Sequence, residues 1–226
     1  TNISNLTWSE GLHNVTIYVN DTVGNLNQSS ISFTVDTIIP TISIPFPSMN
    51  NTNTSNTNLN VNFTFSDLNG ISAAWYSNDT NLINRSLGSG GVISNITNLT
   101  WSEGNHNVTV YVNDTFGNIN QTRISFTIDT TNPSITSLTE NPSDPTTYSA
   151  GITYEFNATI TDTNLGRVLI EFNRTNYSVT NSVGNVFNFT ISNLGGGTYN
   201  YKWHANDSAQ NINTTSGTYT INTAAG

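Results

Sequence analysis

The chain contains a long internal repeat. Residues 5–36 (NLTWSEGLHNVTIYVNDTVGNLNQSSISFTVD) return almost unchanged at 98–129 (NLTWSEGNHNVTVYVNDTFGNINQTRISFTID), an offset of 93 residues. A more divergent third copy occupies 197–222 at the same offset. A period of this length is too long for a solenoid repeat and is typical of a string of small domains. The sequence therefore predicts a tandem array, and such arrays usually supply length or reach rather than chemistry.

Within each repeat, apolar and polar residues alternate between turns rich in Gly, Asn, Asp and Pro, and no helical period appears. In the third unit the alternation places Tyr154, Phe156 and Ile160 on the inward face of one strand, and Tyr201 and Trp203 on that of another. In the second unit the inward positions include Val61, Phe63, Ala73, Trp75, Val108, Val110, Val112, Ile124, Phe126 and Ile128. About seven short strands per unit is typical of an immunoglobulin-like sandwich, in which the third strand often buries a tryptophan such as Trp75. The predicted fold class is all-β, with tandem immunoglobulin-like β-sandwich domains.

Two hinge sequences divide the chain. At 35–44 and at 128–137 a strand ends at Asp, and Pro40 or Pro133 follows within four residues. The fixed φ angle of proline stiffens such a connection. The predicted domains are 37–129 and 130–226, preceded by residues 1–36 as the C-terminal part of an Ig-like domain, with strands E–G only.

Half a sandwich cannot bury its apolar face alone. In residues 1–36 this face comprises Val15, Ile17, Val19, Ile31, Phe33 and Val35. We expect upstream residues, or strands donated by a neighbouring subunit, to cover it. The chain has no signal peptide and opens within a repeat, so we expect a processed product or a piece of a longer chain.

Charge and composition exclude several classes of protein. Only 8% of the residues are charged, the net charge is −9, and five residues are Lys or Arg. Nucleic-acid binding requires basic contacts to phosphate, so this balance argues against a nucleic-acid partner. No run of 18 apolar residues is present, so this segment should not span a membrane. Because the chain has no cysteine, each domain must depend on its core without a disulfide.

The acceptor motif for N-glycosylation, Asn-x-Ser/Thr, occurs 21 times. A chain this rich in Asn, Ser and Thr would contain roughly nine or ten such motifs by chance. Chance is therefore the competing explanation for part of the set. Several acceptors fall on outward positions of the predicted strands, and glycans there would keep a weakly charged surface soluble. The predicted sites include Asn14, Asn62, Asn107, Asn113, Asn157, Asn173, Asn188 and Asn206. Modification of this kind requires export, so the predicted location is extracellular or at the cell surface.

The segments TNLTWSEGNHNVTVYVNDTFGN and GTYNYKWHANDSAQN resemble the Ig-like tandem repeats of archaeal secreted and cell-surface proteins. The resemblance covers the whole chain. It implies an exported, glycosylated, non-enzymatic protein, since such repeats serve as stalks, adhesins and appendage subunits.

Acidic residues fall where the B–C loop, the F–G loop and the incoming linker of a sandwich should meet. Asp36, Asp67 and Asp114 have these places in the second unit, and Asp129, Asp162 and Asp207 in the third. Asn69 and Asn164 could add amide oxygens, and Glu10 and Glu103 could reach the same junctions. Clusters of oxygen ligands suit Ca²⁺. The alternative is turn chemistry without a metal, because Asp and Asn side chains close tight turns by bonding their own backbone.

Catalytic patterns are absent from the sequence. No HExxH, CxxC, Walker or GxGxxG pattern occurs, and the glycine clusters at 88–91 and 195–197 suit turns. His13 and His106 occupy one repeat position and suit a structural role, while His204 has no Ser or acid placed to form a triad. We therefore expect no enzymatic activity.

Three functions remain open. The first is a structural subunit or shaft of an archaeal surface filament or stalk, whose partners are copies of itself and N-glycans. The second is an adhesin or ligand-binding stalk that contacts other cell surfaces, with Tyr111, Trp8 and Trp101 as candidate aromatic residues. The third is a spacer or carbohydrate-binding module of a secreted hydrolase.

Overall fold

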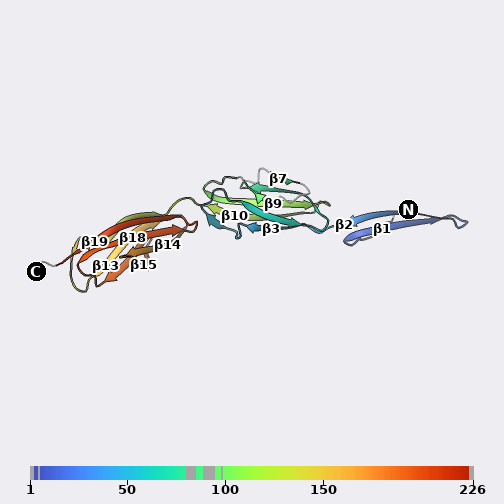
Figure 1. Cartoon of the computed structure of the whole chain (residues 1–226). Helices are drawn as coiled ribbons and strands as arrows, with labels where there is room; N and C mark the ends of the chain where they lie inside the picture. Colours follow the sequence, from blue (N-terminus) through green and yellow to red (C-terminus); the bar gives the residue numbers. More distant parts are fainter. Residues whose placement is uncertain (1–2, 5, 80–84, 89–94, 98, 224–226) are drawn as a thin grey trace. The chain divides into compact units, whose positions relative to one another are not determined.

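The structure is a computed structural model of residues 1–226, and it describes all of them except 1–2, 5, 80–84, 89–94, 98 and 224–226 (Figure 1). Every regular element among the described residues is a β-strand. None of the described residues forms a helix that is long and apolar enough to cross a membrane. The prediction of an all-β fold is confirmed.

Residues 41–128 form two sheets. The first has the order β3 (Thr41–Phe46), β5 (Val61–Ser66), β8 (Asn95–Ile96). The second has the order β4 (Thr52–Thr54), β10 (Ile119–Ile128), β9 (Gly104–Asp114), β6 (Ile71–Asn78), β7 (Arg85–Gly88). The short strand β4 runs parallel to β10, whereas β6 runs antiparallel to β9 and β7. We call this segment the middle sandwich.

Residues 134–222 repeat this arrangement and are called the third sandwich. One sheet has the order β11 (Ser134–Asn141), β13 (Thr153–Thr161), β17 (Val186–Ser192), β16 (Thr180–Val183). The other has the order β12 (Thr146–Thr147), β19 (Ile212–Asn222), β18 (Gly197–Asp207), β14 (Leu165–Phe172), β15 (Thr175–Ser178). In each sandwich a sheet of three or four strands faces a five-stranded sheet. The central strands of the five-stranded sheets, β10–β9–β6 and β19–β18–β14, take the places of strands G, F and C of an immunoglobulin domain, so this is the immunoglobulin-like arrangement.

The cores follow the alternation of the sequence. Val108, Val110 and Val112 of β9 are fully buried, while the residues between them are partly exposed. In the third sandwich, Tyr154, Phe156, Ala158 and Ile160 of β13 and Trp203 of β18 belong to one buried cluster. The predicted inward faces of these strands are therefore confirmed.

The prediction of Ala73 and Trp75 as inward residues is wrong. Ala74 and Tyr76 are the buried residues, and Trp75 lies on the outward face, where its ring stacks on that of Tyr111 at 5.6 Å. The register of β6 shifts against β9 between Ile71 and Ala73. Such an irregularity moves every following side chain to the other face of the sheet, and simple alternation does not reveal it.

Residues 11–35 form the two-stranded hairpin β1 (Gly11–Asn20) and β2 (Leu26–Val35). The expected E strand of this unit would fall at residues 2–3 by the repeat offset from β8, and residue 2 lies outside the described residues. No sheet among the described residues crosses 36/37 or 129/130.

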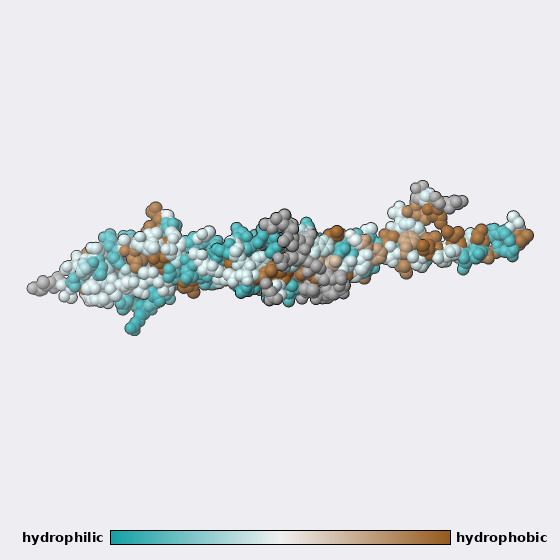
Figure 2. Space-filling model, turned by 90° about the horizontal axis from the view of Figure 1, so that it is seen from above, coloured by the Kyte–Doolittle hydropathy of each residue, from teal (hydrophilic) through white to brown (hydrophobic). Residues whose placement is uncertain are grey.

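Apolar side chains gather on the hairpin surface (Figure 2), and Ile17, Val19 and Ile31 are 58%, 62% and 64% exposed. The expected apolar face is present; Trp8 packs against Phe33 within it, whereas none of the described residues covers Ile17, Val19 and Ile31.

Candidate metal centres

Two clusters of three aspartates form where the sequence placed them. Asp36, Asp67 and Asp114 meet in one, and Asp129, Asp162 and Asp207 meet in the other. In each cluster, one carboxylate oxygen from each aspartate lies within 4.8 Å of the other two. Asp114 and Asp207 are the last residues of β9 and β18, and the other four follow directly on the ends of strands. Each cluster thus gathers the incoming linker, the B–C loop and the F–G turn.

The F–G turn aspartates are held by an asparagine four residues later. Asp114 Oδ1 accepts hydrogen bonds from the backbone N–H of Phe116 at 2.8 Å and of Asn118 at 2.9 Å. Asp114 Oδ2 accepts one from Asn118 Nδ2 at 2.7 Å. Asp207 has the same partners in Asn211, whose backbone N and Nδ2 lie at 2.8 and 2.7 Å. This is the turn chemistry that the sequence offered as the alternative to a metal.

The same asparagines also bind the backbone of the linker. Asn118 Nδ2 donates to the carbonyl of Asp36 at 3.1 Å, and Asn211 Nδ2 to that of Asp129 at 2.7 Å. Two residues further on, the amides of Asn120 and Asn213 donate to the carbonyls of Pro40 and Pro133, at 2.7 and 2.8 Å. Pro40 and Pro133 are both buried. Sequence reasoning missed these four asparagines, although each recurs at the repeat offset.

Asn69 and Asn164 differ from the expectation. We expected them to present amide oxygens, but their Nδ2 groups donate to Asp36 Oδ2 and Asp129 Oδ2, at 2.8 and 2.7 Å. The reason is that an ionised carboxylate only accepts hydrogen bonds, so a neighbouring amide turns its nitrogen toward it. Their backbone N–H groups donate to Asp67 and Asp162.

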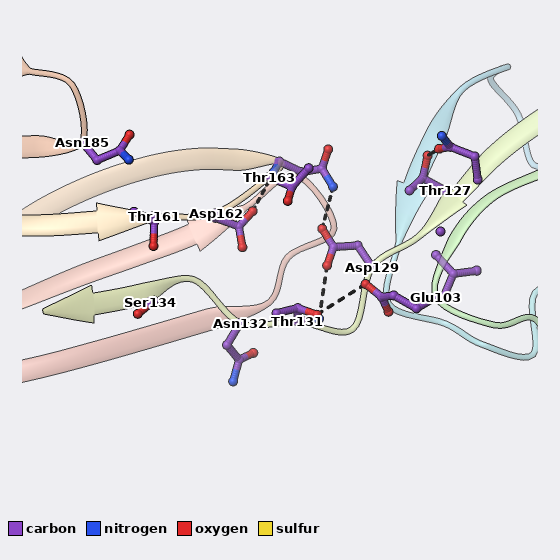
Figure 3. Close-up of a pocket in the computed structure, with 14 residues that line it drawn as sticks. Glu103, Thr127, Asp129, Thr131, Asn132, Ser134, Thr161, Asp162, Thr163 and Asn185 are labelled. Carbon is purple, nitrogen blue, oxygen red and sulfur yellow. Dashed lines mark hydrogen bonds between the residues drawn. The ribbon is translucent and has the colours of Figure 1, made fainter.

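Glu10 and Glu103 bind the linkers instead of joining the aspartate clusters. Glu10 accepts a hydrogen bond from the backbone N–H of Thr37 at 2.9 Å. Glu103 Oε2 accepts from the backbone N–H of Thr130 at 2.9 Å and from its hydroxyl at 2.8 Å. Figure 3 shows Glu103 beside Asp129 and Thr131, with Asp162 on the other side of Asp129. A concave site lined by Glu103, Asp129, Asp162 and neighbouring Thr and Asn residues opens here.

Negative charge is concentrated in both clusters. Asp114, Asp129 and Asp207 are buried, and none of the six aspartates forms an ion pair within the described part of the chain. Burial raises the pKa of Asp162; the backbone N–H of Asn164 opposes this, and the charges of Asp129 and Asp207 add to it. Burial also acts to raise the pKa of Asp114, but the hydrogen bonds from Asn118 and the turn outweigh it and lower that pKa. A cation would relieve the repulsion around Asp162.

The histidines have structural partners. His106 is buried and its Nδ1 lies 2.9 Å from Asp79 Oδ2, while His13 Nε2 lies 2.7 Å from the carbonyl oxygen of Ser9. His204 Nε2 lies 3.7 Å from Glu171 Oε2. These contacts match the structural role expected of His13 and His106. The absence of enzymatic activity stays a prediction.

The predicted glycosylation sites differ in their surroundings. Asn14 and Asn173 are exposed, whereas the other six are partly exposed. Both chain neighbours are buried at five of these six, namely Asn62, Asn107, Asn113, Asn157 and Asn206. Asn188 Nδ2 donates to Glu155 at 2.6 Å and to Asn157 Oδ1 at 2.8 Å. Asn107 accepts a hydrogen bond from the hydroxyl of Ser125 at 2.7 Å. Attachment of glycans at these residues stays a prediction.

No protein-family model matches the sequence, and no curated protein matches it. Among solved structures, the chain is similar to the fibronectin(III)-like modules of Clostridium thermocellum CbhA. The TM-score is 0.51 at 11% identity, over 81% of this chain and 95% of that one. Immunoglobulin domains 1–4 of Sidekick-1 match with a TM-score of 0.46 at 12% identity, over 90% of this chain and 57% of that one. A tetra-tandem repeat in the extending region of a large adhesion protein matches with a TM-score of 0.36 at 19% identity, over 94% and 57% of the two chains.

The likeness to the CbhA modules concerns the fold, because the identity is low. It agrees with the strand orders of the two sandwiches, in which a G–F–C sheet faces the sheet that contains strands A, B and E. The chain is therefore an all-β protein of tandem β-sandwich modules of the immunoglobulin and fibronectin(III)-like type.

Proposed function

We propose that the protein is a structural, non-enzymatic part of an extracellular array, as a subunit or shaft of an archaeal surface filament or stalk. The observation that carries this is the repetition of the linker contacts. At 36–40 and at 129–133, linker carbonyls receive hydrogen bonds from the same pair of asparagines in each repeat. At both places a glutamate also accepts a hydrogen bond from the threonine after the linker aspartate. Linkers that are held by the same contacts in each repeat suit a series of repeated modules.

Negative-stain electron microscopy of the protein from its native surface tests this proposal. Uniform fibres or stalks of repeated modules are expected. Isolated particles that show no continuous series of modules would contradict it.

N-glycans form the second part of the proposal. Glycopeptide mass spectrometry of native protein should find glycans on Asn107 and Asn157, because both lie on outward strand positions within acceptor motifs. Asn132 is the matched control, since the proline after it blocks the acceptor motif. Unmodified peptides at both Asn107 and Asn157 would contradict the prediction.

Ca²⁺ is the proposed ligand of the two aspartate clusters, in each of which three carboxylates meet. We expect Ca²⁺ to raise the melting temperature of the chain, and Asp162→Asn to remove the part of this increase that belongs to the third sandwich. Because the folded state raises the pKa of Asp162, its charge opposes folding at neutral pH. Without Ca²⁺, the variant should therefore be at least as stable as the parent.

Calorimetric titration with Ca²⁺ and melting in chelator measure these effects. Asp21→Asn is the matched control, because Asp21 makes the same turn contacts to Asn25 without the other two aspartates. A melting temperature that is insensitive to both Ca²⁺ and chelator would refute the calcium proposal and leave turn chemistry as the role of the clusters.

Ligand binding is the second candidate function, and one observation favours it. Trp75 and Tyr111 form a stacked pair on the outward face of the middle sandwich. Beside Tyr111 lies a small concavity lined also by Thr109, Gln121, Thr122 and the exposed Arg123. An aromatic face next to a guanidinium suits a sugar that carries a carboxylate. A glycan array tests this: binding of acidic glycans that Arg123→Gln abolishes would support it, and no binding to the array would exclude it.

A further inference from the structure

The apolar face of the β1–β2 hairpin has a direct counterpart within the same chain. By the repeat offset, Ile17, Val19 and Ile31 correspond to Val110, Val112 and Ile124 of the middle sandwich. The first three are more than half exposed, whereas Val110 and Val112 are 0% exposed and Ile124 is 4% exposed. The same surface is therefore a core in one copy and uncovered in the other.

The middle sandwich shows what covers such a face. Opposite the strands β9 and β10, the sheet β3–β5–β8 contributes Val61, Phe63 and Ile96, which are all buried. In the third sandwich, the sheet β11–β13–β17–β16 supplies Tyr154 and Phe156 to the core in the same manner. The face requires a partner sheet whose strands alternate apolar and polar residues.

The residues before the hairpin provide an independent indication. Leu6–Gly11 corresponds to Leu99–Gly104, the segment that connects β8 to β9. There the buried Trp101 donates its indole N–H to the carbonyl of Leu59 at 2.8 Å, just before β5. Trp8 keeps the same packing on its own hairpin: its ring meets Phe33 edge-on at 5.0 Å, as Trp101 meets Phe126 at 4.9 Å. Trp8 is nevertheless 38% exposed, against 4% for Trp101.

The sheets β3–β5–β8 and β11–β13–β17–β16 already bury their apolar faces within their own sandwiches. We propose that the β1–β2 hairpin is the docking half of a further sandwich. Its occupant is a three-stranded antiparallel sheet of the β3–β5–β8 type, from a further copy of the repeat carried by the same polypeptide ahead of the connector 6–10. Covalent linkage favours this source, because a tethered sheet reaches the hairpin at high effective concentration. The proposal is independent of whether the protein forms filaments.

A fusion protein tests the fit of the face to this sheet. In the fusion protein, a second copy of residues 37–97 replaces residues 1–4 of the full chain. Asn5 then follows the copied Thr97, just as Asn98 follows Thr97 in the sequence. Amide hydrogen exchange in Gly11–Asn20 and Leu26–Val35 should slow by about 100-fold or more relative to the unfused chain. The fluorescence of Trp8 should shift to the blue as its ring becomes buried.

Two substitutions in the fusion protein make the result specific. Ile17→Asp puts a charge in the middle of the face and should abolish the added protection. The matched control Tyr18→Asp changes the neighbouring side chain, which the alternation of β1 places on the other face, and should keep the protection. Unchanged exchange in the fusion protein, or equal protection in both variants, would overturn the proposal.

Two further measurements test the source of the sheet. Peptide sequencing of the native polypeptide should read, ahead of Thr1, strands that alternate as β3 and β5 do; a native chain without them would overturn the proposal. Sedimentation of the unfused chain should show a monomer. A dimer that Ile17→Asp dissociates would instead identify a second copy as the occupant.

Discussion

Phe156→Ala is expected to lower the free energy of unfolding of the third sandwich by about 3–5 kcal/mol, the cost of removing a fully buried aromatic ring. Phe156 is 1% exposed. Its ring lies 5.1 to 6.2 Å from those of Phe172, Phe189, Tyr201 and Tyr219, which come from both sheets. No single neighbour can fill the space, so a cavity will remain between the sheets.

Urea unfolding followed by amide exchange in β13 measures this loss. Tyr148→Ala is the matched control, since Tyr148 belongs to the same sandwich and is 43% exposed. It should change the stability by less than about 1 kcal/mol. Equal effects of the two substitutions would mean that the aromatic cluster does not hold the two sheets together.

Gly217→Ala is expected to destabilise the same sandwich by about 3 kcal/mol through overpacking. A Cβ atom at Gly217 would lie 2.3 Å from Cζ and from the hydroxyl oxygen of Tyr201, its cross-strand neighbour. The ring cannot move aside easily, because Tyr201 is 5% exposed and its hydroxyl donates a hydrogen bond to Glu140 on β11. Burial and the neighbouring Glu140 raise the pKa of Tyr201, so this hydroxyl stays protonated and able to donate.

Gly195→Ala is the matched control for this substitution, because no other atom lies within 4 Å of a Cβ there. Thermal unfolding monitored by amide exchange in β18 and β19 separates the two variants. A double variant, Gly217→Ala with Tyr201→Phe, tests the cause: without the hydroxyl the clash is smaller, so the added cost of Gly217→Ala should fall. A cost that does not depend on the hydroxyl would place the strain at the ring carbons Cζ and Cε1, which lie 2.3 and 2.7 Å from the added Cβ.

The outward-facing pair of Trp75 and Tyr111 marks the limit of predicting burial from the alternation of apolar and polar residues. Alternation assigned the buried residues of β9, β13 and β18 correctly, because these strands pair over most of their length without a bulge. It failed at Trp75, because the register of β6 shifts near Ile71 and the alternation does not show this. The stacked contact of Trp75 with Tyr111 follows from that shift.

The all-β class, the immunoglobulin-like arrangement and the two junctions at which three aspartates should meet could all be predicted from the order of residues. This is possible because strand periodicity and an internal repeat are properties of the order of residues, and because a sandwich brings its B–C and F–G loops to one end. How those aspartates are bonded depends on the folded arrangement of the side chains. The amide nitrogens of Asn69 and Asn164 face the carboxylates, and Asn118 and Asn211 hold the linker carbonyls. These choices depend on side-chain orientations among residues up to 82 positions apart, which no local pattern records.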